Sequence, residues 1–278
     1  MAHVLIAGAG YVGIELAGIL RAAGHRVTGL RRTPPVADHG IAWIAADVAQ
    51  PDTLAALPHD IDAVVCAMAP AGHREADYRA VYVDGPANLL AALGPRRDRG
   101  VLLTSSTGVY GCDNGDWVDE DTPPQPTTAT GRVLLEGEWN LLKLCPGATV
   151  VRFSGIYGPG RTLLVDRVLA RRPVQKEPPA YTNRIHRDDA ARVLAWLVSQ
   201  QLAGARLPEC LVASDDDPAP MAEVLAYIAE LLDVPPPPAA PAEAGASRNK
   251  RCRNDRLREL GYTFLYPSYR EGYEDLVG

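Results

Sequence analysis

The first 24 residues hold the feature that most constrains the fold: an apolar run, three spaced glycines and an amphipathic stretch. The run at 4–6 is short and partly β-branched, as expected for a buried parallel strand. Gly8, Gly10 and Gly13 follow in a G-x-G-x-x-G spacing, and apolar residues then recur at helical spacing up to Gly24. A strand, a tight turn and a helix in this order predict a dinucleotide-binding site.

Each glycine of this motif has its own expected task. Gly8 allows the tight turn, Gly10 lets the backbone approach a pyrophosphate, and Gly13 lets the helix pack close to the strand. Tyr11 and Val12 lie between these glycines and are expected to contact the cofactor as well. The helix would present free N–H groups to the phosphates. A glycine-rich turn without a ligand is the alternative, because the motif alone is a weak signal.

Short apolar strands alternate with helical segments through the first 104 residues. Further strands are expected at 25–30, 41–45, 62–68 and 100–104, and helices at 51–57 and 75–93. This alternation predicts an α/β fold, a Rossmann-type doubly wound parallel sheet. Ligands of such sheets bind beyond the carboxyl ends of the strands, so the residues just after each strand are the candidate site.

The second and third strands end in residues that bear on the choice of nucleotide. Arg31 and Arg32 stand where an NAD-selecting site has Asp or Glu. Guanidinium groups suit a 2′-phosphate, so NADP(H) is the predicted cofactor; a solvated basic turn is the alternative. Asp47, beside Val48, could accept a hydrogen bond from the adenine amine. Capping of the helix at 51–57 is an equally good interpretation of Asp47.

The fourth and fifth strands complete the predicted site. Ala67 and Ala69, on either side of Met68, are small enough to let a cofactor pass over the strand end. The fifth strand is followed by three hydroxyl residues at 105–107, the first of which, Ser105, is expected to contact the cofactor. All these positions converge on one edge of the sheet, and this convergence is a stronger signal than any single motif.

Composition narrows the class of protein. The chain has 278 residues, 47% of them apolar, which suits one large α/β domain or one domain with a smaller lobe. A net charge of -6 implies no general attraction to nucleic acid. Five widely spaced cysteines without a C-x-x-C motif argue against a disulfide framework and a zinc site. No apolar stretch approaches 18 residues and no leader is visible, so a cytoplasmic protein is expected.

Five segments together resemble a known family. They are SSTGVYG at 105–111, the acidic-proline loop at 119–124, VRFSGIYGPGR at 151–161, NRIHRDDAA at 183–191 and LGY at 260–262. Over nearly its whole length the chain resembles the extended short-chain dehydrogenase/reductases of the NAD-dependent epimerase/dehydratase type. The resemblance implies a dinucleotide-binding core at 1–157 and a small substrate lobe over most of 158–278, with 179–201 returning to the core.

The family's catalytic pair is missing from this chain. The family carries a Tyr and, four residues later, a Lys on one helix, with a Ser or Thr at the end of the fifth strand. Ser106 provides that hydroxyl, but Thr130 and Leu134 stand at the Tyr and Lys positions. A leucine cannot lower a neighbour's pKa, and a threonine is a poor acid near neutral pH. The usual mechanism is therefore not implied.

Other side chains are candidates for the missing acid and for substrate contacts. Tyr110 is the leading candidate acid, with a packed aromatic side chain as the alternative. Tyr157 could contact substrate or pack a loop, and His186 could contact substrate or orient the start of the following helix. Thr107 and Arg161 are also expected near the substrate. Several arginines in this half favour an anionic group on the substrate, or else form a solvated face.

These observations predict an NADP(H)-dependent oxidoreductase or epimerase-like enzyme with a non-standard catalytic acid, acting on a small polar carbonyl or imine-type substrate. A catalytically inactive NADP(H)-binding sensor or regulatory protein is the alternative. The expected partner is a small-molecule substrate, and no binding to nucleic acid or to a membrane is expected. A homodimer is left open. The proline-rich segment 234–241 predicts an extended spacer, and the basic run 247–253 a solvated face or a contact with an acidic substrate or partner.

Overall fold

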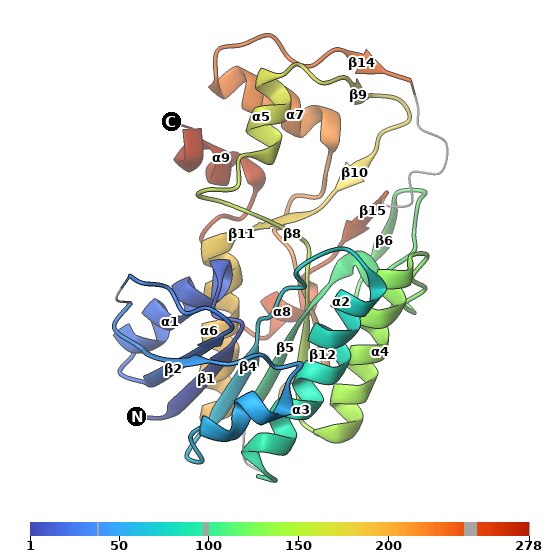
Figure 1. The fold of residues 1–278 in the computed structure, drawn as a ribbon. Helices are drawn as coiled ribbons and strands as arrows, with labels where there is room; N and C mark the ends of the chain where they lie inside the picture. Colours follow the sequence, from blue (N-terminus) through green and yellow to red (C-terminus); the bar gives the residue numbers. More distant parts are fainter. Residues whose placement is uncertain (38, 97–99, 242–248, 278) are drawn as a thin grey trace. The chain divides into compact units, whose positions relative to one another are not determined.

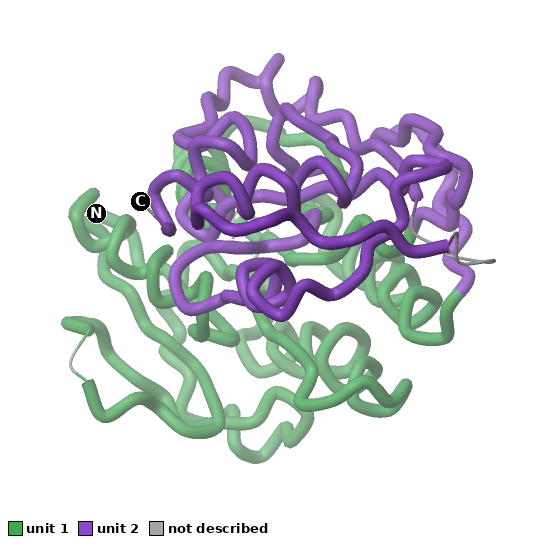
Figure 2. The backbone as a smooth tube through the Cα atoms, turned by 90° about the horizontal axis from the view of Figure 1, so that it is seen from above, with its two compact units in different colours: residues 1–109, 128–152, 191–211 green, residues 110–127, 153–190, 212–278 purple. Residues whose placement is uncertain are grey.

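The computed structural model describes residues 1–37, 39–96, 100–241 and 249–277. The chain divides into two compact units, which Figure 2 shows in different colours. Unit 1 comprises residues 1–109, 128–152 and 191–211. Unit 2 comprises residues 110–127, 153–190 and 212–278. The start of the basic run, at 247 and 248, lies outside the described residues.

A seven-stranded sheet forms the centre of the Rossmann fold, in the order β12-β7-β5-β4-β1-β2-β3 (Figure 1). Its strands are β1 (His3–Ala7), β2 (Arg26–Arg31), β3 (Ala42–Ala45), β4 (Ala63–Cys66), β5 (Gly100–Ser106), β7 (Thr149–Phe153) and β12 (Cys210–Ala213). β1 runs parallel to both of its neighbours, and β2 and β4 run parallel to the strands outside them. Every residue of β1 and β4 is buried, as expected for strands with both faces covered. The predicted doubly wound sheet is confirmed.

The helices of this fold occur largely where the sequence predicts them. They are α1 (Tyr11–Ala22), η1 (Pro51–Ala56), α2 (Glu75–Arg79), η2 (Ala80–Asp84), α3 (Gly85–Leu93), η3 (Thr107–Val109), α4 (Ala129–Leu144) and α6 (Arg187–Leu202). The predicted helix at 75–93 contains a π-helical turn, η2, in its middle. Pro86 has no N–H to donate to the carbonyl of Tyr82, and this explains the departure from α-helical bonding there.

Unit 2 is built from short strand pairs and helices. Its elements are β6 (Asp116–Val118), β8 (Gly155–Tyr157), α5 (Leu163–Leu169), β9 (Val174–Gln175), β10 (Tyr181–Thr182), β11 (Arg184–His186), β13 (Ala219–Pro220), α7 (Met221–Leu231), β14 (Ala239–Ala240), β15 (Lys250–Cys252), α8 (Asp255–Glu259) and α9 (Tyr269–Val277). β8 pairs with β11, β6 with β15, β9 with β14 and β10 with β13. The apolar stripe of α7 packs in the core of this unit, where Val224, Leu225 and Ile228 are fully buried.

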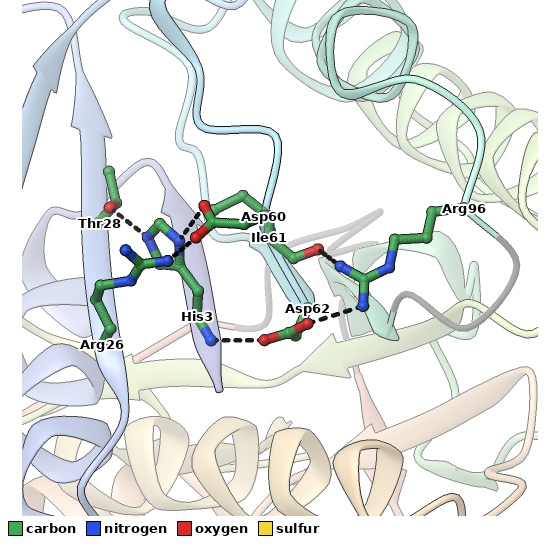
Figure 3. A network of polar contacts seen from close by, with 7 residues as sticks. All are labelled: His3, Arg26, Thr28, Asp60, Ile61, Asp62 and Arg96. Atoms are coloured by element: carbon green, nitrogen blue, oxygen red, sulfur yellow. Dashed lines mark hydrogen bonds and ion pairs between the residues drawn. The ribbon is translucent and has the colours of Figure 1, made fainter. Parts of the chain in front are cut away.

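A polar network holds the amino ends of the central strands together (Figure 3). The buried ring of His3 contacts the Asp60 carboxylate through Nδ1 at 2.9 Å and the Thr28 hydroxyl through Nε2 at 2.8 Å. The Asp62 carboxylate accepts from the His3 backbone N–H and from Arg96, both at 2.8 Å. This network lies at the start of β1 and β4, at the opposite end of the strands from the glycine turn, and so has a structural role.

Two kinds of feature are missing from the part of the chain that the structure describes: a helix that could span a membrane and a cluster of metal-binding side chains. None of these helices is both long and apolar enough to cross a membrane. Within the same residues, no three His, Cys, Asp or Glu side chains are grouped so that they could hold a metal ion.

Candidate functional site

The glycine turn has the geometry that a dinucleotide site requires. Gly8 has a φ of +85°, and a Cβ placed on it would lie 2.5 Å from the Cα of Met68. A Cβ on Gly13 would lie 3.1 Å from the Gly8 carbonyl oxygen, so the helix packs closely on the turn. A Cβ on Gly10 would meet only that same oxygen, at 3.8 Å, and its other sides are open. The tight turn and the close packing predicted for Gly8 and Gly13 are therefore present.

The amino end of α1 presents its backbone to the same turn. Gly10 occupies the N-cap position, and among the described residues no side chain caps the helix. The first turn of α1 also carries no acidic residue. The N–H groups at the start of α1 and the positive end of its dipole therefore suit the phosphates of a dinucleotide. The contact of Gly8 with the backbone of Ala67 and Met68 brings the end of β4 to this turn, as predicted, and Ala69 follows as an exposed residue.

Arg31 and Arg32 follow directly beside the glycine turn. The N–H of Gly8 donates to the carbonyl of Leu30 at 2.9 Å, so the end of β2 is fixed against the turn. Arg31 is half-buried and Arg32 is exposed. Across residues 1–37, 39–96, 100–241 and 249–277, neither guanidinium group forms a hydrogen bond or an ion pair. Two unneutralised cations thus stand at the strand end where dinucleotide sites distinguish NAD from NADP.

Asp47 and Val48 follow β3, and the structure changes the interpretation of Asp47. Its carboxylate accepts from the backbone N–H of Ala49 at 3.0 Å, which closes a local turn. Gln50 occupies the N-cap position of η1, so the alternative in which Asp47 caps that helix is wrong. Val48 is buried, and its carbonyl accepts from the side chain of Asn88 at 2.9 Å.

The end of β5 is anchored by a buried ion pair that sequence reasoning missed. The Ser105 hydroxyl donates to the Glu138 carboxylate at 2.5 Å. Arg152 pairs with the same carboxylate at 2.6 Å, and all three side chains are buried. The Ser105 hydroxyl is therefore committed to the interior of unit 1. The sequence did contain a signal for this ion pair, because Glu138 lies on the otherwise apolar stripe of α4 beside Leu141.

Ser106 and Thr130 carry the two hydroxyls nearest to the family's catalytic positions. Oγ of Ser106 accepts from the backbone N–H of Gly108 at 3.0 Å, at the start of η3. Thr128 caps α4 by accepting from Gly131 at 3.0 Å, and the hydroxyls of Thr128 and Thr130 lie 3.3 Å apart. Leu134, the residue that the sequence predicts at the position of the family's Lys, is buried.

The remaining candidates have structural contacts. The Tyr110 hydroxyl donates to the carbonyl of Asp119 at 2.6 Å, and its side chain is only 2% exposed. This favours the packed-aromatic interpretation over that of a free acid. Thr107 is buried in η3. Arg161 donates to the carbonyl of Ile156 at 2.9 Å.

Tyr157 and His186 pack edge to face inside unit 2, with ring centroids 5.3 Å apart. Nδ1 of His186 accepts from the backbone N–H of Asp188 at 3.3 Å, as the helix-start interpretation requires. Burial raises the pKa of Tyr157 and lowers that of His186. The Tyr157 phenol is therefore a poorer proton donor than an exposed tyrosine.

A parallel sheet with a glycine turn after its first strand and an open helix end beside it defines a Rossmann-type dinucleotide-binding protein. The model of the NAD dependent epimerase/dehydratase family matches residues 4–208, so the chain belongs to this family. The family establishes a nicotinamide dinucleotide as the cofactor and confirms the predicted oxidoreductase or epimerase-like class of enzyme.

Individual relatives cover almost the whole chain. One is the 3-diazoavenalumate denitrifying reductase of Streptomyces sp., 30% identical over 97% of this chain and 98% of the relative. Protein YeeZ of Escherichia coli (strain K12) is also 30% identical, over 96% of this chain and 97% of its own. A solved structure from Methylobacillus flagellatus, provisionally assigned as an NAD-dependent epimerase/dehydratase, is 38% identical with a TM-score of 0.83. It covers 99% of this chain and 97% of its own.

Proposed function

We propose that this chain is an NADP(H)-dependent oxidoreductase or epimerase-like enzyme acting on a small polar substrate with a carbonyl or imine-type group. The observation that carries the proposal is the amino end of α1 at Gly10, beside Arg31 and Arg32, whose guanidinium groups form no hydrogen bond or ion pair with the described residues. The name of the Streptomyces relative, a reductase named for a diazo compound, favours reduction over epimerisation.

Arg31 and Arg32 are proposed to select NADP(H) over NAD(H). The 2′-phosphate carries about two negative charges, and charge-assisted bonds to arginine are the strongest hydrogen bonds that side chains make. An adenosine ribose without this phosphate would leave both cations unpaired. The amino end of α1 would hold the pyrophosphate, which is common to both cofactors and gives no selectivity.

Ser106 is proposed to hold the reacting oxygen or nitrogen of the substrate. When bound, the cofactor supplies a hydride. Oγ of Ser106 accepts from Gly108, which leaves its own hydrogen to donate to the substrate. Thr130, at the position of the family's Tyr, can orient a group but has no acidic proton near neutral pH. Because the Tyr110 hydroxyl already donates to Asp119, Tyr110 is given no part in proton transfer. Full turnover by Ser106→Ala would contradict the role of Ser106.

A second function has one specific observation in its favour. Leu134 is buried at the position where the family has its lysine, so a bound cofactor ribose would lack that cation. A protein that binds NADP(H) without turning it over, as a sensor does, would have this combination. An anionic substrate group, contacts at Thr107, Tyr157, Arg161 and His186, a cytoplasmic location and a homodimer remain predictions from the sequence.

Fluorescence titration with NADPH and NADH tests the cofactor proposal. We expect tighter binding of NADPH, and at least a tenfold loss of NADPH affinity in the Arg31→Ala/Arg32→Ala variant with NADH binding unchanged. Arg206→Ala is the matched control, since Arg206 is an exposed arginine that precedes β12, at the amino end of the sheet. An unchanged ratio of the two affinities would reject the selectivity argument. NADPH oxidation with a panel of carbonyl, imine and diazo compounds then separates the enzyme from the sensor.

A further inference from the structure

Unit 2 encloses a cluster of buried polar side chains to which the proposed reaction assigns no step. Each member has one buried polar atom without a hydrogen-bond partner among the described residues. The atoms belong to Tyr157 (Oη), Arg184 (a terminal guanidinium nitrogen), His186 (Nε2), Asp215 (Oδ2) and Tyr269 (Oη). The five side chains come from β8, β11, the segment after β12, and α9, and none is more than 6% exposed.

Several contacts join these five residues into one cluster. The ring of Tyr157 meets that of His186 edge to face, at 5.3 Å between centroids. The guanidinium carbon of Arg184 lies 5.1 Å from the centroid of the Tyr269 ring. The backbone N–H of Asp215 donates to the carbonyl of Arg184 at 2.7 Å. Arg184 and His186 stand two residues apart on β11 and so share one face of that strand, and His186 pairs in register with Tyr157 of β8.

The chemistry of the five atoms defines what can satisfy them. Because Nδ1 of His186 accepts from Asp188, its Nε2 carries the hydrogen and donates. Arg184 also donates, Oδ2 of Asp215 accepts, and the two phenols can do either. Arg184 repels a cation, and burial raises the pKa of Asp215 well above its usual value, so that its carboxyl group can donate as well as accept a hydrogen bond. The cluster therefore needs a small partner that both donates and accepts hydrogen bonds.

Water is such a partner. An unsatisfied buried polar group costs about 1–3 kcal/mol, and native proteins leave few of them. A buried water typically makes about three hydrogen bonds to groups of this kind. We propose that Tyr157, Arg184, His186, Asp215 and Tyr269 form an internal water site that ties the β8–β11 pair to α9.

Removal of single hydroxyls tests this proposal through the sign of its effect on stability. If water binds the phenols, Tyr157→Phe and Tyr269→Phe each break a hydrogen bond, and Tm falls by about 2–4 °C. If the hydroxyls have no partner, the same changes remove an unsatisfied buried group and Tm rises. Tyr273→Phe is the matched control, since Tyr273 is equally buried and stacks on Tyr157 at 4.8 Å, but its hydroxyl is not among the unpartnered atoms.

Water itself is detected by ¹⁷O magnetic relaxation dispersion of the full chain, which reports water molecules held for longer than the tumbling time. We expect this signal to decrease in Tyr157→Phe and Tyr269→Phe and to persist in Tyr273→Phe. A rise in Tm or an unchanged signal in both test variants would overturn the proposal. A higher Tm in chloride buffer than in glutamate buffer would also overturn it, because the occupant would then be an anion. If a variant fails to fold, a high-resolution crystal structure of the native chain decides whether ordered water contacts these atoms.

Discussion

At the scale of single residues, the pairing of Glu138 with Arg152 shows a charge buried for structural reasons. Glu138 lies on α4 and Arg152 on β7, and together they fix the Ser105 hydroxyl on β5. Three elements of unit 1 are thus joined by one carboxylate. The same helix carries Glu136, which forms a two-point pair with Arg79 but remains about 40% exposed. The two glutamates therefore allow the stability contributions of a buried and an exposed ion pair to be compared on one helix.

We expect Glu138→Gln to lower the free energy of unfolding by about 3–5 kcal/mol, because Arg152 would remain buried without its counter-ion. Glu136→Gln should change it by no more than about 1 kcal/mol, since solvent screens an exposed pair. Urea unfolding of the two variants measures both values. Equal losses would mean that burial does not determine the strength of these pairs.

At the scale of elements, the contact between α4 and the π-helical turn η2 depends on one glycine. A Cβ placed on Gly137 would lie 2.3 Å from the carbonyl oxygen of Tyr82. That carbonyl lies four residues before Pro86, which cannot donate to it, so the helix deviates there. The missing side chain at Gly137 therefore lets α4 pack closely against the irregular turn η2.

Gly137→Ala should destabilise unit 1 by about 1–3 kcal/mol, because the two helices must move apart to make room for the methyl group. Gly18→Ala on α1 is the control. Nothing lies within 4 Å of a Cβ at Gly18, so this change should stabilise the protein by up to about 1 kcal/mol through the unfolded chain. Thermal unfolding measures whether each variant is more or less stable than the wild type. A stabilising Gly137→Ala would contradict the close contact.

At the scale of the whole molecule, several carboxylates make the native state sensitive to acid. Hydrogen bonds hold the pKa of Asp60, Asp62 and Glu136 below their usual values. For Asp62 the main cause is the backbone N–H of His3, which donates to its carboxylate. A lowered pKa in the folded state contributes stability above the unfolded pKa, and this contribution disappears as the pH falls through the folded value.

Asp62→Asn should therefore destabilise the protein at pH 7, and the loss should shrink once the pH falls below the ordinary aspartate pKa of 3.8. Unfolding free energies of wild type and variant at pH 7 and pH 3 measure the change. Asp113→Asn, at an exposed loop position, is the control and should have no effect at either pH. An Asp62→Asn effect of equal size at both pH values would show that the charge is not the cause.

Much of the fold could be predicted because its signals are local. The period of the apolar residues located the central strands within one or two residues, and the spacing of Gly8, Gly10 and Gly13 identified the turn. The predicted end of the fourth strand was two residues too late, since β4 ends at Cys66. The predicted end of the fifth strand was two residues too early, since β5 continues to Ser106. Boundaries of this kind depend on hydrogen bonds to neighbouring strands, which periodicity does not contain.

The state of each candidate hydroxyl could not be predicted in the same way. Ser105 and Ser106 are adjacent in the sequence, yet one donates to a buried carboxylate and the other accepts from a loop N–H. Side chains alternate between the two faces of a strand, so the partner of each depends on what covers that face. The sequence predicts Tyr110 as the candidate acid, whereas in the structure its hydroxyl donates a hydrogen bond to the carbonyl of Asp119.

The sequence by itself determined the family and the sheet, and it predicts the place of the cofactor, because strand periodicity and a glycine turn are properties of neighbouring residues. It also predicts that Thr130 and Leu134 stand at the positions of the usual catalytic pair. Only the tertiary structure decided that Glu138 and Arg152 anchor β5, and that five buried polar atoms of unit 2 have no hydrogen-bond partner among the described residues. These features depend on contacts between residues far apart in the chain, and only folding brings such residues together.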